Sequence, residues 1–122
     1  MILADTTIWI DHLNRGDPEL QRRLHGEEIL MHPFVVGELA LGPLPDRKKT
    51  ILFLDCLPRV RVAQQSEVRY MIEMHALHNR GIGLIDAHLI AAVLLNPGTE
   101  LWTRNGSLRK IAARLEIDAN LP

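Results

Sequence analysis

The sequence has a single cysteine, no long apolar run and almost no net charge, and each shortage argues against a class of protein. Cys56 cannot form an internal disulfide, and its neighbours match no metal-binding or catalytic motif. We therefore expect it to be a buried residue that only fills space in the core. The longest apolar run, residues 89–95, has seven residues, whereas a membrane-spanning helix needs about 20. A formal net charge of -1 argues against a protein that coats nucleic acid by bulk attraction, although it leaves a nuclease open.

The residues that are present are typical of one folded unit. Of the 122 residues, 47% are apolar and 24% are charged, which is an ordinary globular composition with enough apolar residues for a sizeable core. We therefore expect a single domain over residues 1–122. An acidic residue, Asp5, stands where a secretory signal would carry positive charge before a long apolar stretch. This start predicts a cytoplasmic location.

Short apolar runs alternate with helical patterns along the chain. Strands are expected over residues 2–4, 28–31, 60–62 and 100–103, with one more starting at Ile117. Helices are expected up to Gly16 and over residues 19–25, 33–41, 46–56, 66–80, 84–95 and 107–115. This alternation indicates an α/β fold whose mainly parallel sheet carries helices on both faces. Trp9 and Trp102 are expected in the core or at an interface.

Four polar side chains near the ends of the predicted strands form one candidate constellation. Asp5 ends the first strand, and Glu38 lies within the helix after the second. Asp86 opens the most apolar helix, and Asn105 follows the strand that ends at Thr103. Because active sites of open parallel sheets form at the carboxyl ends of the strands, these four residues are the candidates for a site.

Each acid also has a purely structural interpretation. Asp5 could cap the helix that follows it, and Asp86 could be an N-terminal acid favoured by the helix dipole. Glu38 is flanked by apolar residues and would be costly to bury without partners, yet it could also lie on an exposed face. Converging carboxylates repel one another unless a cation neutralises them, and Mg²⁺ and Mn²⁺ prefer oxygen ligands. A metal site accounts for the three acids together.

Four segments resemble, in order and in separation, the motifs of PIN-domain proteins. Residues 2–11, 35–42, 83–92 and 101–105 read ILADTTIWID, VVGELALG, GLIDAHLIAA and LWTRN. Together they span nearly the whole chain, which makes the likeness far more specific than any one motif. The closest likeness is to the VapC ribonuclease toxins of bacterial toxin–antitoxin pairs.

This resemblance implies a PIN-like three-layer sandwich and an endoribonuclease activity that depends on Mg²⁺ or Mn²⁺. It also implies an RNA substrate, a cognate VapB-like antitoxin that covers the active site, and a homodimer. Residue by residue, Asp5, Glu38 and Asp86 match the metal-binding acids of the family. Thr6 matches the hydroxyl residue that often follows the first acid.

The chain departs from the family pattern at Asn105, where an aspartate is common. An amide oxygen can accept a hydrogen bond from a metal-bound water, but it carries no charge and cannot act as a base. The three remaining carboxylates can hold one Mg²⁺ with several waters. We therefore expect single-ion chemistry, or a second ion recruited only with substrate phosphate. Asn105 could equally cap the next helix, and the two roles are compatible.

Basic residues that follow the fourth motif are candidates for substrate contact. Arg104, Arg109, Lys110 and Arg114 could form a rim that contacts RNA phosphates. Arginine is suited to such contacts because its planar guanidinium can donate two parallel hydrogen bonds. The same residues could instead belong to an ordinary charged helix.

Two rival functions share these features. A catalytically weak PIN module would bind RNA or a partner protein without cleaving, and Asn105 is the one residue that favours it. Metal-dependent cleavage separates this module from a nuclease. A phosphoacceptor receiver-like domain also clusters acids at strand ends, but it needs a lysine after a late strand. Lys48, Lys49 and Lys110 are not so placed.

Overall fold

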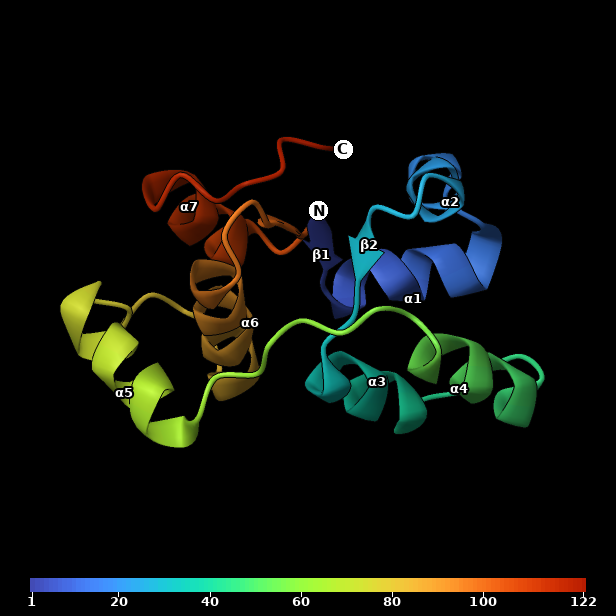
Figure 1. Ribbon diagram of the computed structural model, residues 1–122, viewed down its shortest axis with the longest axis horizontal. Helices are drawn as coiled ribbons and strands as arrows, with labels where there is room; N and C mark the ends of the chain where they lie inside the picture. The colour runs from blue at the N-terminus through green and yellow to red at the C-terminus, as the bar shows by residue number, and fades with distance from the viewer.

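A parallel sheet of three short strands lies at the centre of the computed structural model, which describes residues 1–122 (Figure 1). In spatial order the strands are β2 (Ile29–Leu30), β1 (Ile2–Ala4) and β3 (Glu100–Trp102). Leu3 of β1 is in register with Leu30 on one side and Leu101 on the other. β1 is buried along its whole length, as expected of a central parallel strand covered on both faces.

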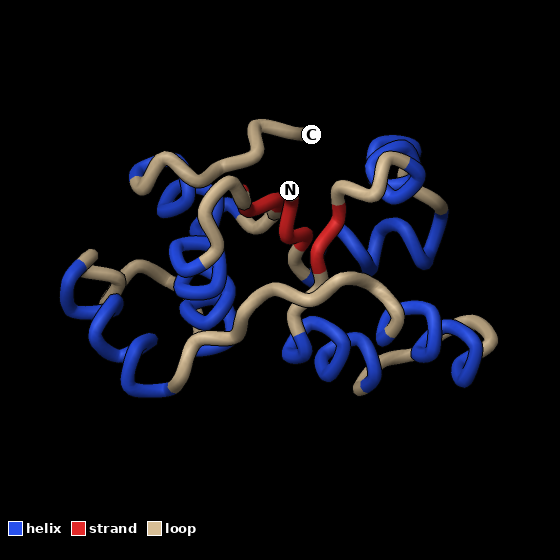
Figure 2. Tube along the Cα trace, viewed as in Figure 1, coloured by secondary structure: helices blue, strands red, loops and turns tan.

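Seven helices cover this sheet from both sides. In Figure 2 the blue helices stand on either side of the red strands, and Figure 1 places α1 to α4 on one side and α5 to α7 on the other. Their bounds are α1 (Thr6–Arg15), α2 (Pro18–His25), α3 (Pro33–Ala40), α4 (Arg47–Asp55), α5 (Gln65–Met74), α6 (Leu84–Leu95) and α7 (Gly106–Arg114). This arrangement confirms the predicted α/β sandwich with helices on both faces of a parallel sheet.

Local chemistry places most helix ends close to where the sequence predicts them. Asp17 caps α2 by accepting a hydrogen bond from the Leu20 N–H at 2.9 Å. His32 caps α3 in the same way, because its Nδ1 accepts from the Phe34 N–H at 3.0 Å. α6 is apolar on all sides and is buried over residues 87–93, which places it in the core. None of the helices is long and apolar enough to cross a membrane.

One cluster of 24 buried side chains connects the sheet to its helices. Trp9 of α1 and Trp102 of β3 are fully buried in it, which confirms their prediction as core residues. β1 lies between the other two strands and packs against α1, and all three of its side chains are buried. The core therefore holds the end of β1 in a fixed position relative to the surrounding helices.

Two predicted strands do not form. Beside residues 60–62 there is a single parallel bridge, between Met31 and Arg59. β2 is only two residues long, so residues 60–62 find no partner strand long enough to form a ladder. The strand expected from Ile117 is likewise reduced to one bridge, between Leu101 and Asp118. The prediction of these strands rested on residue type alone, whereas a strand also needs a partner of matching length.

Two further local predictions are wrong. The helix expected to reach Arg80 ends at Met74, because Ala76 and Asn79 adopt left-handed conformations with φ of 51° and 57°. Cys56, expected to be buried, is exposed. It lies at the C-terminal cap of α4, a helix in which only Leu54 is buried.

Candidate active site

Asp5 lies where β1 ends and α1 begins, and its side chain is almost completely buried. Its Oδ1 accepts from the N–H groups of Thr7 and Ile8 at 2.9 and 3.3 Å, which makes Asp5 the N-cap of α1. The hydroxyls of Thr7 and Thr103 also donate to its two carboxylate oxygens. The capping role considered for Asp5 is therefore present. The same bonds fix its carboxylate at the carboxyl edge of the sheet.

Glu38 reaches the same edge from α3. Thr6 follows Asp5 directly, and its Oγ1 donates a hydrogen bond to Glu38 Oε1 at 2.6 Å. This bond joins the first turn of α1 to α3, two helices that pack against each other. Glu38 is exposed, so it lies on a surface face and is not a buried charge; the sequence had left both possibilities open. Its carboxylate nonetheless lies beside the residue that follows Asp5.

Asp86 lies half-buried in the first turn of α6, where its Oδ2 accepts from the Gly83 N–H at 3.4 Å. Burial raises the pKa of Asp86 above its usual value, and the negative charges of Asp5 and Glu38 raise it further. Such an effect on the pKa requires the charges to be near one another. The structure therefore brings the three predicted acids into one region, which we call the acidic site.

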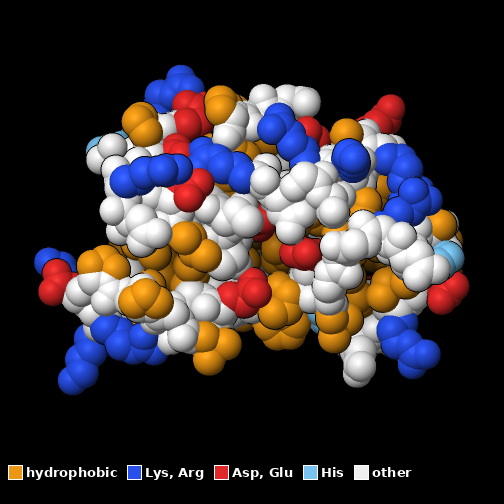
Figure 3. All heavy atoms as spheres, turned by 180° about the vertical axis from the view of Figure 1, so that it is seen from behind, with side chains coloured by type: hydrophobic (Ala, Val, Ile, Leu, Met, Phe, Trp, Pro, Cys, Tyr) orange, Lys and Arg blue, Asp and Glu red, His pale blue; other side chains and the backbone are white.

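No basic side chain neutralises the acidic site. None of the ion pairs in the structure includes Asp5, Glu38 or Asp86. Burial also raises the pKa of Asp5, although four hydrogen bonds favour its ionised form. Figure 3 shows acidic side chains near the middle of one face, with Lys and Arg side chains placed around its periphery. The acidic site is thus an uncompensated negative region, which a divalent cation would stabilise.

The acidic site offers a suitable donor set for Mg²⁺ or Mn²⁺ without forming a closed cage. Carboxylate oxygens are the hard ligands that these ions prefer. No three acidic, histidine or cysteine side chains lie close enough together to hold a metal ion as they stand. A closed cage is not required, since Mg²⁺ usually keeps several waters and binds through one or two carboxylates plus substrate phosphates. The residues fit such an ion, and exposed Glu38 has the most freedom to move towards it.

Asn105 caps α7, since its Oδ1 accepts from the Leu108 N–H at 3.2 Å. Its own N–H donates to Thr103 Oγ1 at 3.0 Å, and Thr103 in turn donates to Asp5. Asn105 is therefore connected to the acidic site through one hydroxyl group. The capping role is present in the structure, and a role for Asn105 in positioning a metal-bound water stays a prediction.

Sequence comparison relates this fold and its acids to known proteins. The profile of the PIN domain matches residues 2–114. The chain belongs to the PIN domain family. It is 38% identical over 113 residues to "Ribonuclease VapC32" of Mycobacterium tuberculosis (strain CDC 1551 / Oshkosh), and equally to the protein of that name from strain ATCC 25618 / H37Rv. Each match covers 93% of this chain and 91% of the relative.

The family predicted from four motifs is confirmed, as is the relationship of this PIN domain to VapC proteins. The matched region includes all four predicted site residues, namely Asp5, Glu38, Asp86 and Asn105. The match identifies the family, whereas the chemical role of each residue stays a prediction that the geometry above supports.

Arg104 of the PIN domain is engaged with protein groups. Its guanidinium pairs with Asp11 at 2.7 Å and with Asp17 at 2.5 Å, and its Nε donates to the Pro122 carbonyl at 2.7 Å. The guanidinium also lies over the Trp102 ring, 5.6 Å from its centroid. A role for Arg104 in substrate contact stays a prediction, and in this structure its donors connect β3 to α1 and to the cap of α2.

Replacing Arg104 with glutamine is expected to lower the free energy of unfolding by about 2 kcal/mol, because a hydrogen bond to a charged group contributes about 1.5–3 kcal/mol. Burial alone would raise the pKa of Asp17, but hydrogen bonds from the Leu20 N–H and from Arg104 outweigh it and lower that pKa. Urea unfolding at pH 7 measures the change. The control is Arg15→Gln, whose exposed pair with Asp11 spans 3.7 Å and should matter little. Equal losses in both variants would contradict the structural role of Arg104.

Arg109 is less constrained than Arg104. Its Nε donates to Asp118 Oδ2 at 3.3 Å, and its side chain is 44% exposed. The terminal nitrogens of its guanidinium make no hydrogen bond within the chain. The predicted role of Arg109 in contacting substrate therefore stays a prediction that its exposure permits.

Sequence reasoning missed the two threonines that hold Asp5. Thr7 donates to one oxygen of Asp5 and Thr103 to the other. Thr7 carried a signal, since a threonine two residues after an N-cap acid is within reach of it. Thr103 carried none, because it is 98 residues away in the chain and was read only as a strand end.

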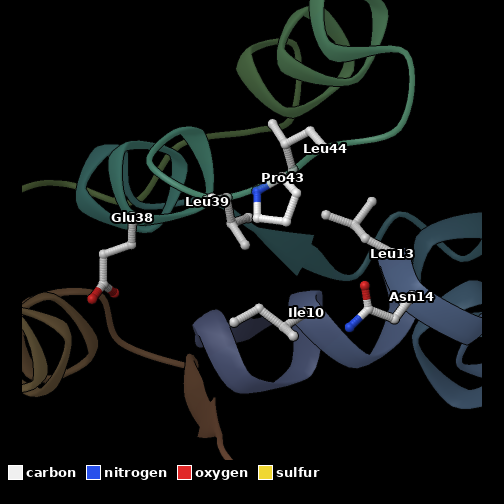
Figure 4. A pocket seen from close by; sticks show the side chains of 8 residues that line it. Ile10, Leu13, Asn14, Glu38, Leu39, Pro43 and Leu44 are labelled. Atoms are coloured by element: carbon white, nitrogen blue, oxygen red, sulfur yellow. The ribbon is translucent and has the colours of Figure 1, made fainter.

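An apolar pocket opens beside Glu38 (Figure 4). It has a volume of about 130 Å³ and is lined by Ile10, Leu13, Asn14, Glu38, Leu39, Gly42, Pro43 and Leu44. In Figure 4 the Glu38 carboxylate points away from the apolar side chains that line the rest of the pocket. The acidic site of the PIN domain is therefore bordered on this side by apolar surface.

Proposed function

We propose that this PIN domain is a Mg²⁺- or Mn²⁺-dependent endoribonuclease that acts as the toxin of a toxin–antitoxin pair. The acidic site carries the proposal, because the charges of Asp5 and Glu38 act on Asp86 and none of the three carboxylates has a basic partner. The relationship to proteins named Ribonuclease VapC32 supports RNA as the substrate. Carboxylates repel a phosphodiester, so a cation between the two is the simplest way for this site to bind and cleave RNA.

The ion would be held by Asp5, Glu38 and Asp86. When bound, it would polarise the phosphate and lower the pKa of an attacking water. The chain itself contributes orientation, since Thr103 holds the Asp5 carboxylate and Thr6 holds that of Glu38. Groups that are oriented before the substrate arrives need no rearrangement during the reaction, which is where preorganised sites gain rate.

Asn105 favours a site with one resident ion. It is connected to Asp5 through the Thr103 hydroxyl and has an amide oxygen in place of a fourth carboxylate. We propose that it positions a metal-bound water, and that a second ion enters only with the phosphate of the substrate. Three carboxylates with several waters are sufficient for one Mg²⁺.

The apolar pocket beside Glu38 supports inhibition by a cognate VapB-like antitoxin in the cytoplasm. An apolar side chain of the antitoxin would fill the pocket, and a basic side chain would pair with the acidic site. Both contacts would block access of RNA to the acids.

The toxin itself is proposed to be a homodimer, which light scattering of the purified protein tests.

The proposed activity is tested by incubating total RNA with the purified, antitoxin-free protein in Mg²⁺, in Mn²⁺ and in EDTA. We expect discrete fragments with either metal and a rate at least about 100-fold lower in EDTA, since a bound ion contributes several kcal/mol to catalysis. Adding excess Mg²⁺ after EDTA is the control and should restore cleavage. Equal cleavage in EDTA would overturn the metal dependence.

A second candidate function is a PIN module that binds RNA or a partner protein without cleaving it. Asn105 favours this candidate, because the site lacks the charge of a fourth acid. The same incubation separates the two functions. RNA that stays intact under both metals while still binding the protein would identify the binding module.

A further inference from the structure

A second cavity, which is polar and which we call the basic pocket, lies between α7 and the loop that follows α5. It has a volume of about 200 Å³ and is lined by Arg80, Ser107, Lys110, Ile111 and Arg114. No acidic residue lines it, and none of its three basic side chains takes part in an ion pair. In a chain with a net charge of -1, such a cavity is a local concentration of uncompensated positive charge.

The end of α5 orients the two guanidinium groups of the basic pocket. Arg80 Nε donates to the Ala76 carbonyl at 3.1 Å, and Arg114 Nη2 donates to the His75 carbonyl at 2.7 Å. Carbonyls that follow the last turn of a helix lack partners within the helix and attract cations. Each guanidinium uses one of its five N–H groups in this way, so most of its donors remain available to a ligand.

The early end of α5 is what forms the basic pocket. A helix continued to Arg80 would carry that residue away along its axis, whereas the left-handed turn at Ala76 and Asn79 brings it back towards α7. The loop that follows lies close to α7, since a Cβ added to Gly81 would lie 3.2 Å from Ser107 Oγ. The hydroxyl of Ser107 is thereby held in the same cavity as the three cations.

Both elements that form the basic pocket also lead to the acidic site. The loop from Arg80 continues to Gly83, whose N–H binds Asp86, and Ser107 lies two residues after Asn105. Asp86 is six positions after Arg80, a span of at most about 21 Å even for a fully extended chain. In Figure 3, Lys and Arg side chains lie around the periphery of this face, with acidic side chains nearer the middle.

We propose that the basic pocket binds a backbone phosphate of the RNA strand whose cleavage is proposed above, a few nucleotides from the bond that is cut. The proposal rests on the proposed function. Forked guanidinium donors, an ammonium group and a hydroxyl match the oxygens of one phosphate. Binding at this point would hold the strand in register over the acidic site, which itself repels phosphate.

The test is RNA binding by the intact 122-residue chain in EDTA, measured by fluorescence anisotropy with a labelled single-stranded RNA at several salt concentrations. Lys110→Gln removes a charge that makes no hydrogen bond within the chain, so the fold should be unaffected. We expect affinity about five- to tenfold weaker at low salt. The slope of log K against log salt should fall by about 0.7, the value for one phosphate contact on a single strand.

The matched control is Lys48→Gln, an exposed lysine on α4, which lies on the opposite side of the sheet from α7 (Figure 1). It should leave both affinity and slope unchanged. Equal effects of Lys110→Gln and Lys48→Gln would overturn the proposal, because binding would then be bulk attraction. An RNA affinity of Lys110→Gln equal to that of wild type would overturn the proposal too. That holds even if inorganic phosphate binds in the pocket or the substitution weakens antitoxin binding. Cleavage of RNA in Mg²⁺ is measured separately. The proposed nuclease activity can therefore be supported even if phosphate binding in the basic pocket is disproved.

Discussion

Replacing Asp86 with asparagine is expected to lower the rate of RNA cleavage on the order of 10³-fold while making the metal-free protein more stable. A metal ion supplies several kcal/mol of transition-state stabilisation, and each 1.4 kcal/mol, roughly, is a factor of ten. The stability should rise because the raised pKa of Asp86 means that its ionised form is disfavoured in the folded state. A residue that costs stability and supports activity is typical of a functional site.

The expected gain has a definite pH dependence. The folded-state pKa of Asp86 lies above its unfolded value, so wild type loses stability relative to Asp86→Asn as the pH rises through that interval. Urea unfolding in EDTA at pH 4 and pH 7 measures this difference. With Mg²⁺ at about 100 times its dissociation constant, wild type should gain about 2.7 kcal/mol and the variant much less.

Asp46→Asn is the matched control for this substitution. Asp46 is exposed, makes no side-chain capping bond and belongs to no ion pair, so its replacement should change neither cleavage nor stability. Circular dichroism establishes that both variants are folded. Full cleavage by a folded Asp86→Asn protein would remove Asp86 from the proposed site.

Lowering the pH from 7 to 4 is expected to cost about 3 kcal/mol of stability through His32 alone. Burial of this ring, with the charges of His88 and Arg59 nearby, lowers its pKa to about 4 from an ordinary value of 6.5. In the unfolded chain His32 is therefore protonated below pH 6.5, whereas in the folded protein it is protonated only near pH 4 and below. Each pKa unit is worth about 1.4 kcal/mol, so stability is complete above pH 6.5 and falls below it.

His32→Asn isolates this contribution. Asparagine is a good N-cap and can replace the bond from His32 Nδ1 to the Phe34 N–H, but it does not titrate. The variant should lose less stability than wild type between pH 7 and pH 4, whatever its stability at pH 7. His25→Asn, at an exposed position, is the control and should follow wild type. Parallel pH profiles for wild type and His32→Asn would show that His32 is not the titrating group.

The positions of Asp5 and Asn105 in the fold were predictable because each stands next to a local signal. Asp5 follows an apolar run at the start of a helical pattern, and Asn105 follows a strand and precedes a helix. Both are helix caps, and a cap at the carboxyl end of a parallel strand lies at the edge where such sheets place their sites. For these residues the structural and the functional interpretation predict the same location.

The partners of these residues were not predictable, because they come from distant parts of the chain. Arg104 pairs with two acids that precede it by 87 and 93 residues, and nothing beside Arg104 in the sequence indicates them. Arg80 was not among the predicted site residues. No glycine or proline interrupts residues 66–80, so the sequence predicted one helix with Arg80 at its end. Its position depends on left-handed conformations at Ala76 and Asn79, which non-glycine residues adopt only when packing favours them.

The strand order has a consequence for how this protein is made. β1 is the first strand to leave the ribosome, yet one of its two neighbours in the sheet is β3, the last. The bond from Thr103 to Asp5 likewise joins residues 98 positions apart. Chains emerge at roughly 5–20 residues per second, so β1 waits several seconds for its second neighbour during translation. A chain interrupted before residue 100 would lack β3 and the Thr103 hydroxyl that donates to Asp5 Oδ2, so the proposed active site is completed only after β3 has been made.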